Sequence, residues 1–179
     1  YIYDSVFNKP NSYQISLKND ENNFYKKRVA FLEDDLQIDY FVQDIGNFEI
    51  INSIKEFYSD KEILDVCAAP GGKSILLSTY GFKVEALDKS QSQIDKFKQN
   101  IKRLSIDIKI VKKDFLSAKI NRRYNSILLD APCSALGTFR RNPDVISKID
   151  KKKLKVNQDI QVKMIDKSLI LLNKGGILV

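Results

Sequence analysis

Two short segments of this chain combine residue types that could hold a ligand and react with it. The first is Cys67–Lys73 (Cys-Ala-Ala-Pro-Gly-Gly-Lys), which directly follows the apolar run Ile63–Val66. Small residues let a backbone approach a ligand closely, and a helix that starts here would present free N–H groups to polar ligand atoms. The spacing matches neither a P-loop nor G-x-G-x-x-G, so a phosphate cradle is a poor fit.

The second segment is Asp130-Ala-Pro-Cys-Ser134, which follows the apolar run Ser126–Leu129. An isolated cysteine is more often an inert, buried side chain than a reactive one. Within this segment we interpret Cys133 as functional. We assign Cys67, in contrast, a structural role in lining the ligand loop that the first segment forms. The chain contains no histidine, which removes Ser-His and Cys-His nucleophile pairs and any Cys/His metal set.

Two further acids follow predicted strands. Asp88 ends the stretch 82–87, near the usual spacing of ~20 residues after a Gly-rich turn, where a carboxylate can bind both hydroxyls of a ribose. Asp114 follows the stretch 108–111 and is placed to reach an adenine amino group. A single aspartate after a strand is usually a helix cap, but candidate groups at three successive strand ends favour a binding site.

The elements that must position these residues alternate between strands and helices, which predicts βαβ units and an α/β fold with a mostly parallel sheet. Apolar residues at helical spacing place Ile94, Phe97, Ile101 and Leu104 on one helix face, and Ser90 with Gln93 predicts a capping box at its start. The expected helices cover 46–58, 73–80 and 155–173, and the expected strands cover 63–67, 82–87, 108–111 and 126–129. A fifth strand is expected at 175–179, and the sequence stops within it. We therefore expect the sheet to be incomplete at its C-terminal end.

The charge balance favours an anionic partner. Thirty Lys and Arg residues oppose 23 Asp and Glu residues, for a net charge of +7, although a biased composition explains a basic surface equally well. No apolar run approaches the ~20 residues of a membrane span, and no secretory signal pattern opens the chain. We therefore expect a cytoplasmic protein with no membrane partner and no metal.

The segment Asp65–Ser74 resembles the cofactor motif of the RNA 5-methylcytosine methyltransferases, which include the bacterial Sun/RsmB ribosomal RNA enzymes and the eukaryotic NOL/NSUN relatives. The resemblance covers roughly residues 41–179 and implies a Rossmann-like methyltransferase fold with S-adenosylmethionine as the methyl donor. The cofactor-binding residues that it implies are Cys67, Ala68, Ala69, Pro70, Gly71, Gly72, Lys73, Asp88, Asp114 and Asp130.

The resemblance also implies a role for the second segment in base chemistry. Cytosine C5 becomes nucleophilic when a thiolate adds to C6, and an acid such as Asp130 near N3 lowers that barrier. In the family, the cysteine of Asp-Ala-Pro-Cys assists product release, and the attacking thiol lies in a Thr-Cys-Ser segment after strand five. The expected catalytic residues are therefore Cys133 and Asp130, while the segment expected to carry the nucleophile lies beyond Val179.

Basic residues follow the second segment and predict contact with RNA. Arg140 and Arg141 resemble the family's Arg-Arg-x-Pro-Asp segment on the RNA side of the site, where guanidinium groups hold phosphate or stack on bases. Residues 41–179 are the predicted catalytic domain, truncated in strand five. Residues 1–40, with one short strand at 13–17, are predicted to be part of an RNA-recognition or linker region.

The leading hypothesis is methyl transfer from S-adenosylmethionine to C5 of a cytosine in RNA, with ribosomal RNA as the favoured substrate. One alternative is an inactive fragment that binds cofactor or RNA without turnover, and a weaker one is direct attack by Cys133. A transfer RNA substrate is less favoured. DNA cytosine-5 methyltransferases are disfavoured because Ala-Ala-Pro-Gly-Gly-Lys is not their cofactor loop.

Overall fold

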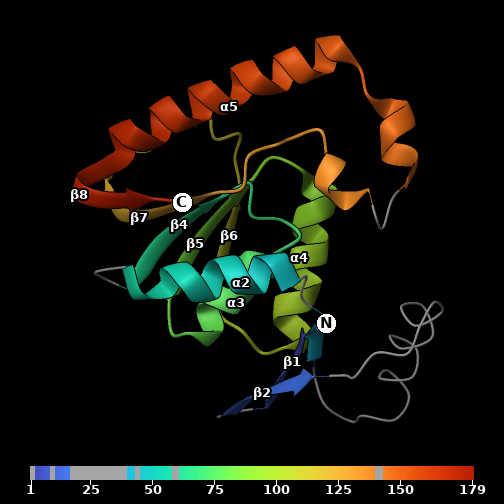
Figure 1. Cartoon of the computed structure of the whole chain (residues 1–179). Helices are drawn as coiled ribbons and strands as arrows, with labels where there is room; N and C mark the ends of the chain where they lie inside the picture. Colours follow the sequence, from blue (N-terminus) through green and yellow to red (C-terminus); the bar gives the residue numbers. More distant parts are fainter. Residues whose placement is uncertain (1–2, 9–10, 17–39, 43–44, 58–60, 140–142) are drawn as a thin grey trace.

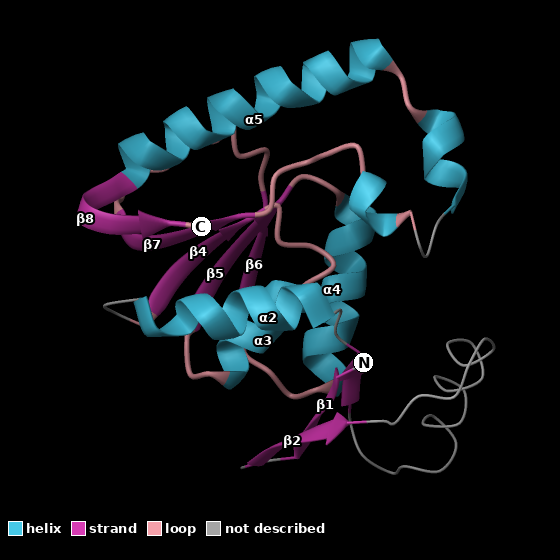
Figure 2. Ribbon diagram, in the orientation of Figure 1, coloured by secondary structure: helices cyan, strands magenta, loops and turns pink. Residues whose placement is uncertain are grey.

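The computed structural model describes residues 3–8, 11–16, 40–42, 45–57, 61–139 and 143–179 (Figure 1). Its centre is a five-stranded parallel sheet with helices on both faces (Figure 2). The strands are β4 (Glu62–Val66), β5 (Lys83–Asp88), β6 (Lys109–Lys112), β7 (Tyr124–Leu129) and β8 (Leu172–Leu178), in the spatial order β6-β5-β4-β7-β8. The chain first builds the sheet on one side of β4 and then continues on the other side, which creates a switch point between β4 and β7 where such sheets bind ligands.

Helices cover the two faces unequally. On one face lie α2 (Ile45–Ile54), α3 (Gly72–Thr79) and α4 (Gln91–Arg103), and on the other lies the long α5 (Lys151–Leu171) (Figure 1). Short 3-10 turns, η1 (Lys55–Phe57), η2 (Leu136–Thr138) and η3 (Pro143–Lys148), lie between these elements. No helix in the described part of the chain combines the length and apolarity needed to cross a bilayer.

Each strand contributes to two hydrophobic cores, because neighbouring side chains on a strand point to opposite faces of the sheet. Ile63 of β4 packs into the core beneath α2, α3 and α4, while its neighbour Leu64 packs into the core beneath α5. The predicted apolar face of α4 is confirmed: Ile94, Phe97 and Leu104 are buried, and Ile101 packs against the same core. The predicted α/β class with a parallel sheet is therefore confirmed as well.

Several predicted element bounds differ from the structure, and those of α5 and β8 are described here. Helix α5 begins at Lys151, earlier than the predicted 155, because the Asp150 side chain caps it by accepting a hydrogen bond from the Lys152 N–H (2.8 Å). Strand β8 begins at Leu172, which pairs with Tyr124 before the register shifts. The glycines at 175 and 176 therefore lie inside the irregular part of β8 and do not mark the start of the strand.

The predicted capping box at the start of α4 is wrong. Ser90 is the N-cap residue, but its side chain makes no capping bond, and its hydroxyl lies 3.2 Å from that of Ser92 instead. The backbone N–H of Ser90 donates to Asp88 Oδ1, so the start of α4 is linked to the end of β5 through the Asp88 carboxylate.

The N-terminal part forms a separate antiparallel sheet of β1 (Tyr3–Asn8), β2 (Asn11–Ser16) and β3 (Tyr40–Val42), in the order β2-β1-β3. Strand β2 overlaps the predicted strand at 13–17. Strand β3 crosses the predicted boundary at residue 40 and pairs with β1. The division into 1–40 and 41–179 remains a prediction.

Candidate functional site

The loop between β4 and α3 turns sharply at the carboxyl end of the central strand. Cys67 adopts a left-handed backbone conformation (φ 62°), and the Gly71 N–H donates to the Ala68 carbonyl (2.9 Å). The Ala68 N–H donates to the carbonyl of Leu87 on β5 (3.0 Å), which ties the loop to the neighbouring strand. The first predicted segment thus lies at the switch-point edge of the sheet, where its backbone faces the strand ends.

Gly71 has a structural reason to be a glycine. Its φ is +106°, a conformation that side chains other than glycine rarely adopt, and a Cβ there would lie 2.4 Å from the buried ring of Phe97. The ring of Phe97 therefore sets how closely α4 and the loop can approach. Unlike its neighbours, Gly71 does not line the cavity described next.

A small cavity of about 120 Å³ opens beside this loop. Its lining brings together most of the predicted cofactor residues with two residues that the sequence did not single out, Asn47 of α2 and Asp65 of β4. The full lining is Asn47, Asp65, Cys67, Ala68, Ala69, Pro70, Gly72, Lys73 and Asp130. A residue from α2 was not expected because nothing in the sequence links that helix to the loop.

Lys73 and Asp130 join the two predicted segments directly. The Lys73 ammonium donates to Asp130 Oδ2 at 2.7 Å, between the first turn of α3 and the end of β7. The Lys73 side chain is 16% exposed and that of Asp130 is 57% exposed, so the pair lies at the mouth of the cavity. Charge-assisted hydrogen bonds of this kind are stronger than neutral ones, and this one couples the two loops.

Asp88 lies at the end of β5, as predicted, and both of its carboxylate oxygens accept backbone N–H groups. Oδ2 accepts from Ala69 in the loop (3.1 Å) and Oδ1 accepts from Ser90 (2.8 Å). Each carboxylate oxygen can accept more than one hydrogen bond, so these contacts orient Asp88 and still leave acceptor capacity for a ligand.

Asp65 is the most unusual ionisable group of the site. It is 1% exposed, and its Oδ2 accepts a hydrogen bond from the Ser74 hydroxyl. Burial raises the pKa of this carboxyl to about 7, and the charges of Asp130 and Asp88 add to the rise, while Ser74 and Lys73 oppose it. The pattern Asp65–Ser74 contained this residue, but only the structure shows its burial.

The surroundings of Cys67 disfavour its thiolate. Burial, together with the negative charges of Asp88 and Asp65, raises its pKa to about 12. A thiol with such a pKa carries almost no thiolate near neutral pH, and the thiolate is the reactive form. This environment supports the prediction that Cys67 lines the ligand loop and is not a nucleophile.

Cys133 lies on the loop that follows β7 and is exposed. The loop is held at three places: the Asp130 N–H donates to the Val66 carbonyl (3.2 Å), Gln161 of α5 donates to the Pro132 carbonyl (2.8 Å), and the Ala135 N–H donates to the Cys133 sulfur (3.3 Å). Gln161 is a further residue that sequence reasoning missed. Its place on α5 shows that this helix positions the second segment as well as covering the sheet.

The remaining predicted residues are Asp114, Arg140 and Arg141. Asp114 lies after β6, and its Oδ1 accepts from the Leu116 N–H (2.9 Å), so it caps a turn at the same edge of the sheet. It does not line the cavity, and its contact with an adenine stays a prediction. Arg140 and Arg141 lie outside the described residues, so their contact with RNA stays a prediction too.

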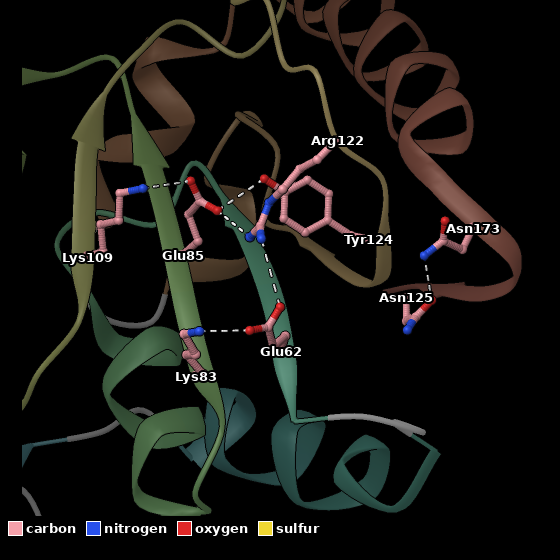
Figure 3. A network of polar contacts seen from close by, with 8 residues as sticks. All are labelled: Glu62, Lys83, Glu85, Lys109, Arg122, Tyr124, Asn125 and Asn173. Carbon is pink, nitrogen blue, oxygen red and sulfur yellow. Dashed lines mark hydrogen bonds and ion pairs between the residues drawn. The ribbon is translucent and has the colours of Figure 1, made fainter.

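A second, larger hollow of about 400 Å³ lies at the opposite, amino-terminal ends of the strands. Most of its charged groups pair with one another, as Figure 3 shows: Glu85 accepts from Lys109, Arg122 and the Tyr124 hydroxyl, and Glu62 pairs with Lys83. Arg122 also lies 4.3 Å from the centre of the Tyr124 ring. This network fastens the connection from β6 to β7, and we interpret it as structural because its acids and bases pair with each other.

The strand order, the ligand loop after the central strand and the acids after the next strands are those of the Rossmann-like folds, the fold class to which S-adenosylmethionine-dependent methyltransferases belong. The family model "16S rRNA methyltransferase RsmB/F" matches residues 52–179. The chain therefore belongs to the RsmB/F family of 16S rRNA methyltransferases, as the sequence resemblance predicted.

Individual proteins similar to this chain support the same family assignment. Ribosomal RNA small subunit methyltransferase B of Photorhabdus laumondii is 36% identical over 149 residues, which cover 77% of this chain and 33% of the relative. The Shewanella oneidensis protein of the same name is 40% identical over 106 residues, 55% of this chain and 23% of that one. The crystal structure of NSun6 from Pyrococcus horikoshii with SFG matches with a TM-score of 0.67 and 28% identity, and it covers 78% of this chain and 36% of that one. The chain thus spans about a third of the length of the relative from Photorhabdus laumondii.

Proposed function

We propose that this chain provides the cofactor site and part of the base site for methyl transfer from S-adenosylmethionine to C5 of a cytosine in RNA, with ribosomal RNA as the substrate. The observation that carries the proposal is the Lys73–Asp130 contact at 2.7 Å. It places the loop expected to hold the methyl donor beside the loop expected to handle the base. A methyl transfer needs donor and acceptor in contact, because a positioned pair reacts far faster than a free one.

The cavity fits the proposed cofactor chemically. The amino-acid part of S-adenosylmethionine carries an ammonium and a carboxylate, and the cavity lining offers the cation Lys73 and the acids Asp65 and Asp130. The Asp88 carboxylate, already oriented by Ala69 and Ser90, is the group we assign to the ribose hydroxyls. When bound, the cofactor supplies an electrophilic methyl group.

The second loop would handle the base. We assign Asp130 to the polar edge of the cytosine, which it would meet with Oδ1 because Lys73 holds Oδ2. The exposed Cys133 would act on the methylated intermediate and assist its release, as the family resemblance implies. A target cytosine must leave its stack to reach such a loop, and this costs least in single-stranded or looped RNA.

The basic charge supports an RNA partner. The net charge of +7 and the exposed lysines at the start of α5 would bind phosphate groups, so affinity should weaken as salt is raised. We propose that Arg140 and Arg141 contribute to this surface. The cytoplasmic location expected from the sequence stays a prediction.

The cofactor site is tested by calorimetric titration of S-adenosylmethionine into the chain and into Asp88→Ala. We expect the variant to bind at least about tenfold more weakly, because it loses the acceptor for the ribose and the anchor of two loop N–H groups. The matched control is Asp95→Ala, which removes an exposed aspartate of α4 that bonds only to Gln91 among the described residues. Unchanged affinity in Asp88→Ala would show that the cofactor is misplaced.

The position of the methyl group is tested with this protein and ribosomal RNA. We expect radiolabel from the donor to enter RNA and bisulfite sequencing to report a protected cytosine. Radiolabelled RNA without any bisulfite-resistant cytosine would keep the methyltransferase assignment and refute the C5 assignment.

A further inference from the structure

Asp65 has an acceptor atom that nothing in the described structure uses. Its Oδ2 takes the Ser74 hydroxyl, whereas its Oδ1 is fully buried and has no hydrogen-bond partner among the described residues. A buried polar atom without a partner costs free energy, and the great majority of such atoms in proteins are paired. Because Asp65 also lines the cavity, the missing partner would be a donor group of the molecule that binds there.

The charges around Asp65 indicate which kind of donor this is. Lys73 of α3 is the basic group that faces it, and that ammonium already donates to Asp130. Asp130 at the end of β7 and Asp88 at the end of β5 are the acids that face it. Two further acids near a buried carboxyl favour a positively charged ligand group, because that group would relieve the repulsion among the three carboxyl groups.

We propose that Asp65 Oδ1 accepts a hydrogen bond from a cationic ammonium of the ligand, and that Asp65 gives up a proton to solvent when this ligand binds. The inference rests on the proposed function, in which the ligand is S-adenosylmethionine and the ammonium belongs to its amino-acid part. Before binding, the carboxyl carries its proton on Oδ1. After binding, the carboxylate faces the ammonium, and the proton has passed to the buffer.

The surroundings of Asp65 support this step. Burial raises the pKa of Asp65 to about 7, so near neutral pH a large share of cofactor-free molecules carries the proton. A cation placed against Oδ1 favours the ionised form and lowers that pKa. Binding and proton release are then linked, and the affinity rises with pH until Asp65 is already ionised in the free protein.

This proton release predicts how the affinity for S-adenosylmethionine depends on pH. Below pH 7 the affinity should fall by up to about tenfold for each pH unit, since each binding event must expel one proton. Above about pH 8 the α-amino group of the ligand loses its own proton, so the affinity should fall again. The affinity is therefore expected to be highest between these limits. The chain has no histidine to obscure the acidic side of the profile.

The test is calorimetric titration of S-adenosylmethionine at pH 6 in two buffers with different ionisation enthalpies, which counts released protons. We expect the wild-type chain to release close to one proton, and Asp65→Asn to release none. Asn keeps the size of the side chain and an oxygen for Ser74, but it cannot carry the charge. The variant should bind at least about tenfold more weakly at pH 7.5 and show a flat profile between pH 5.5 and 7.

A second variant keeps the inference testable if Asp65→Asn fails to fold. Ser74→Ala keeps Asp65 and removes a hydrogen bond that lowers its pKa, so the midpoint of the acidic limb should move to higher pH. Equal proton release by the wild type and Asp65→Asn, or an unmoved midpoint in Ser74→Ala, overturns the inference while the cofactor proposal stands. A wild-type chain that does not bind S-adenosylmethionine at any pH overturns both.

Discussion

Replacing Gly71 with alanine should destabilise the fold far more than the size of one methyl group suggests. At φ +106° a side chain costs about 1–2 kcal/mol relative to glycine. The new Cβ would also lie 2.4, 2.6 and 2.8 Å from three atoms of the Phe97 ring, which is fully buried and cannot move aside. Overpacking of this kind costs about 1–3 kcal/mol. The sum, roughly 2–5 kcal/mol, is a large part of the ~5–15 kcal/mol that stabilises a typical domain.

Gly81→Ala is the matched control. Gly81 also has a positive φ, +83°, but the nearest atom to its added Cβ is the mobile end of Lys61 at 3.4 Å. Gly81→Ala should therefore lower the free energy of unfolding only by the cost of the positive φ, about 1–2 kcal/mol. Urea unfolding followed by far-UV circular dichroism gives the free energies of unfolding.

A double variant separates the clash from the backbone strain. Phe97→Leu removes ring atoms that Gly71→Ala would meet, so the double variant should lose less stability than the sum of the two single variants. Equal losses in Gly71→Ala and Gly81→Ala, together with strict additivity in the double variant, would refute the assigned role of the Phe97 ring.

Two further predictions concern the same edge of the sheet. The folded state raises the pKa of Asp65 from 3.8 to about 7, so it binds a proton more tightly than the unfolded chain does. Asp65 should therefore make the cofactor-free protein lose stability as pH rises from about 4 to 7. Urea unfolding at pH 5 and pH 7.5 should show a larger loss for the wild type than for Asp65→Asn. Gln161→Ala should release the Pro132 carbonyl, so hydrogen exchange of the backbone amides of Ala131 and of 133–135 should quicken, while the exposed substitution Gln158→Ala on the same helix should leave them unchanged. Unaltered exchange in Gln161→Ala would mean that the other two anchors suffice to hold the loop.

Much of the fold could be predicted because local patterns and tertiary structure agree here. Short apolar runs ending in Asp88 and Asp130 marked the strand ends, and a parallel sheet brings the ends of its strands to one edge. The predictions failed where a competing contact decided the local structure. Ser90 and Gln93 had the right spacing for a capping box, but the Ser90 hydroxyl lies against Ser92.

The sequence could indicate the lining residues of the continuous segment 67–73, whereas several contacts between distant segments were missed. The position of Phe97 against Gly71 joins a helix face to a loop 26 positions earlier, and no local pattern contains that contact. Gln161 bonds to Pro132 across 29 positions for the same reason. Asp65 stood within the recognised segment, yet its unused oxygen depends on burial by several elements, which only the structure gives.

The contrast between the two cysteines makes the chain a ready carrier for a spectroscopic probe. Raising the Cys67 pKa from 9.0 to about 12 lowers its thiolate fraction about a thousandfold near neutral pH. Cys133 is exposed, so a maleimide dye added to the unaltered protein should attach there and spare Cys67. The dye would then sit on the loop assigned to the base, and its emission would report the arrival of RNA without any engineered residue.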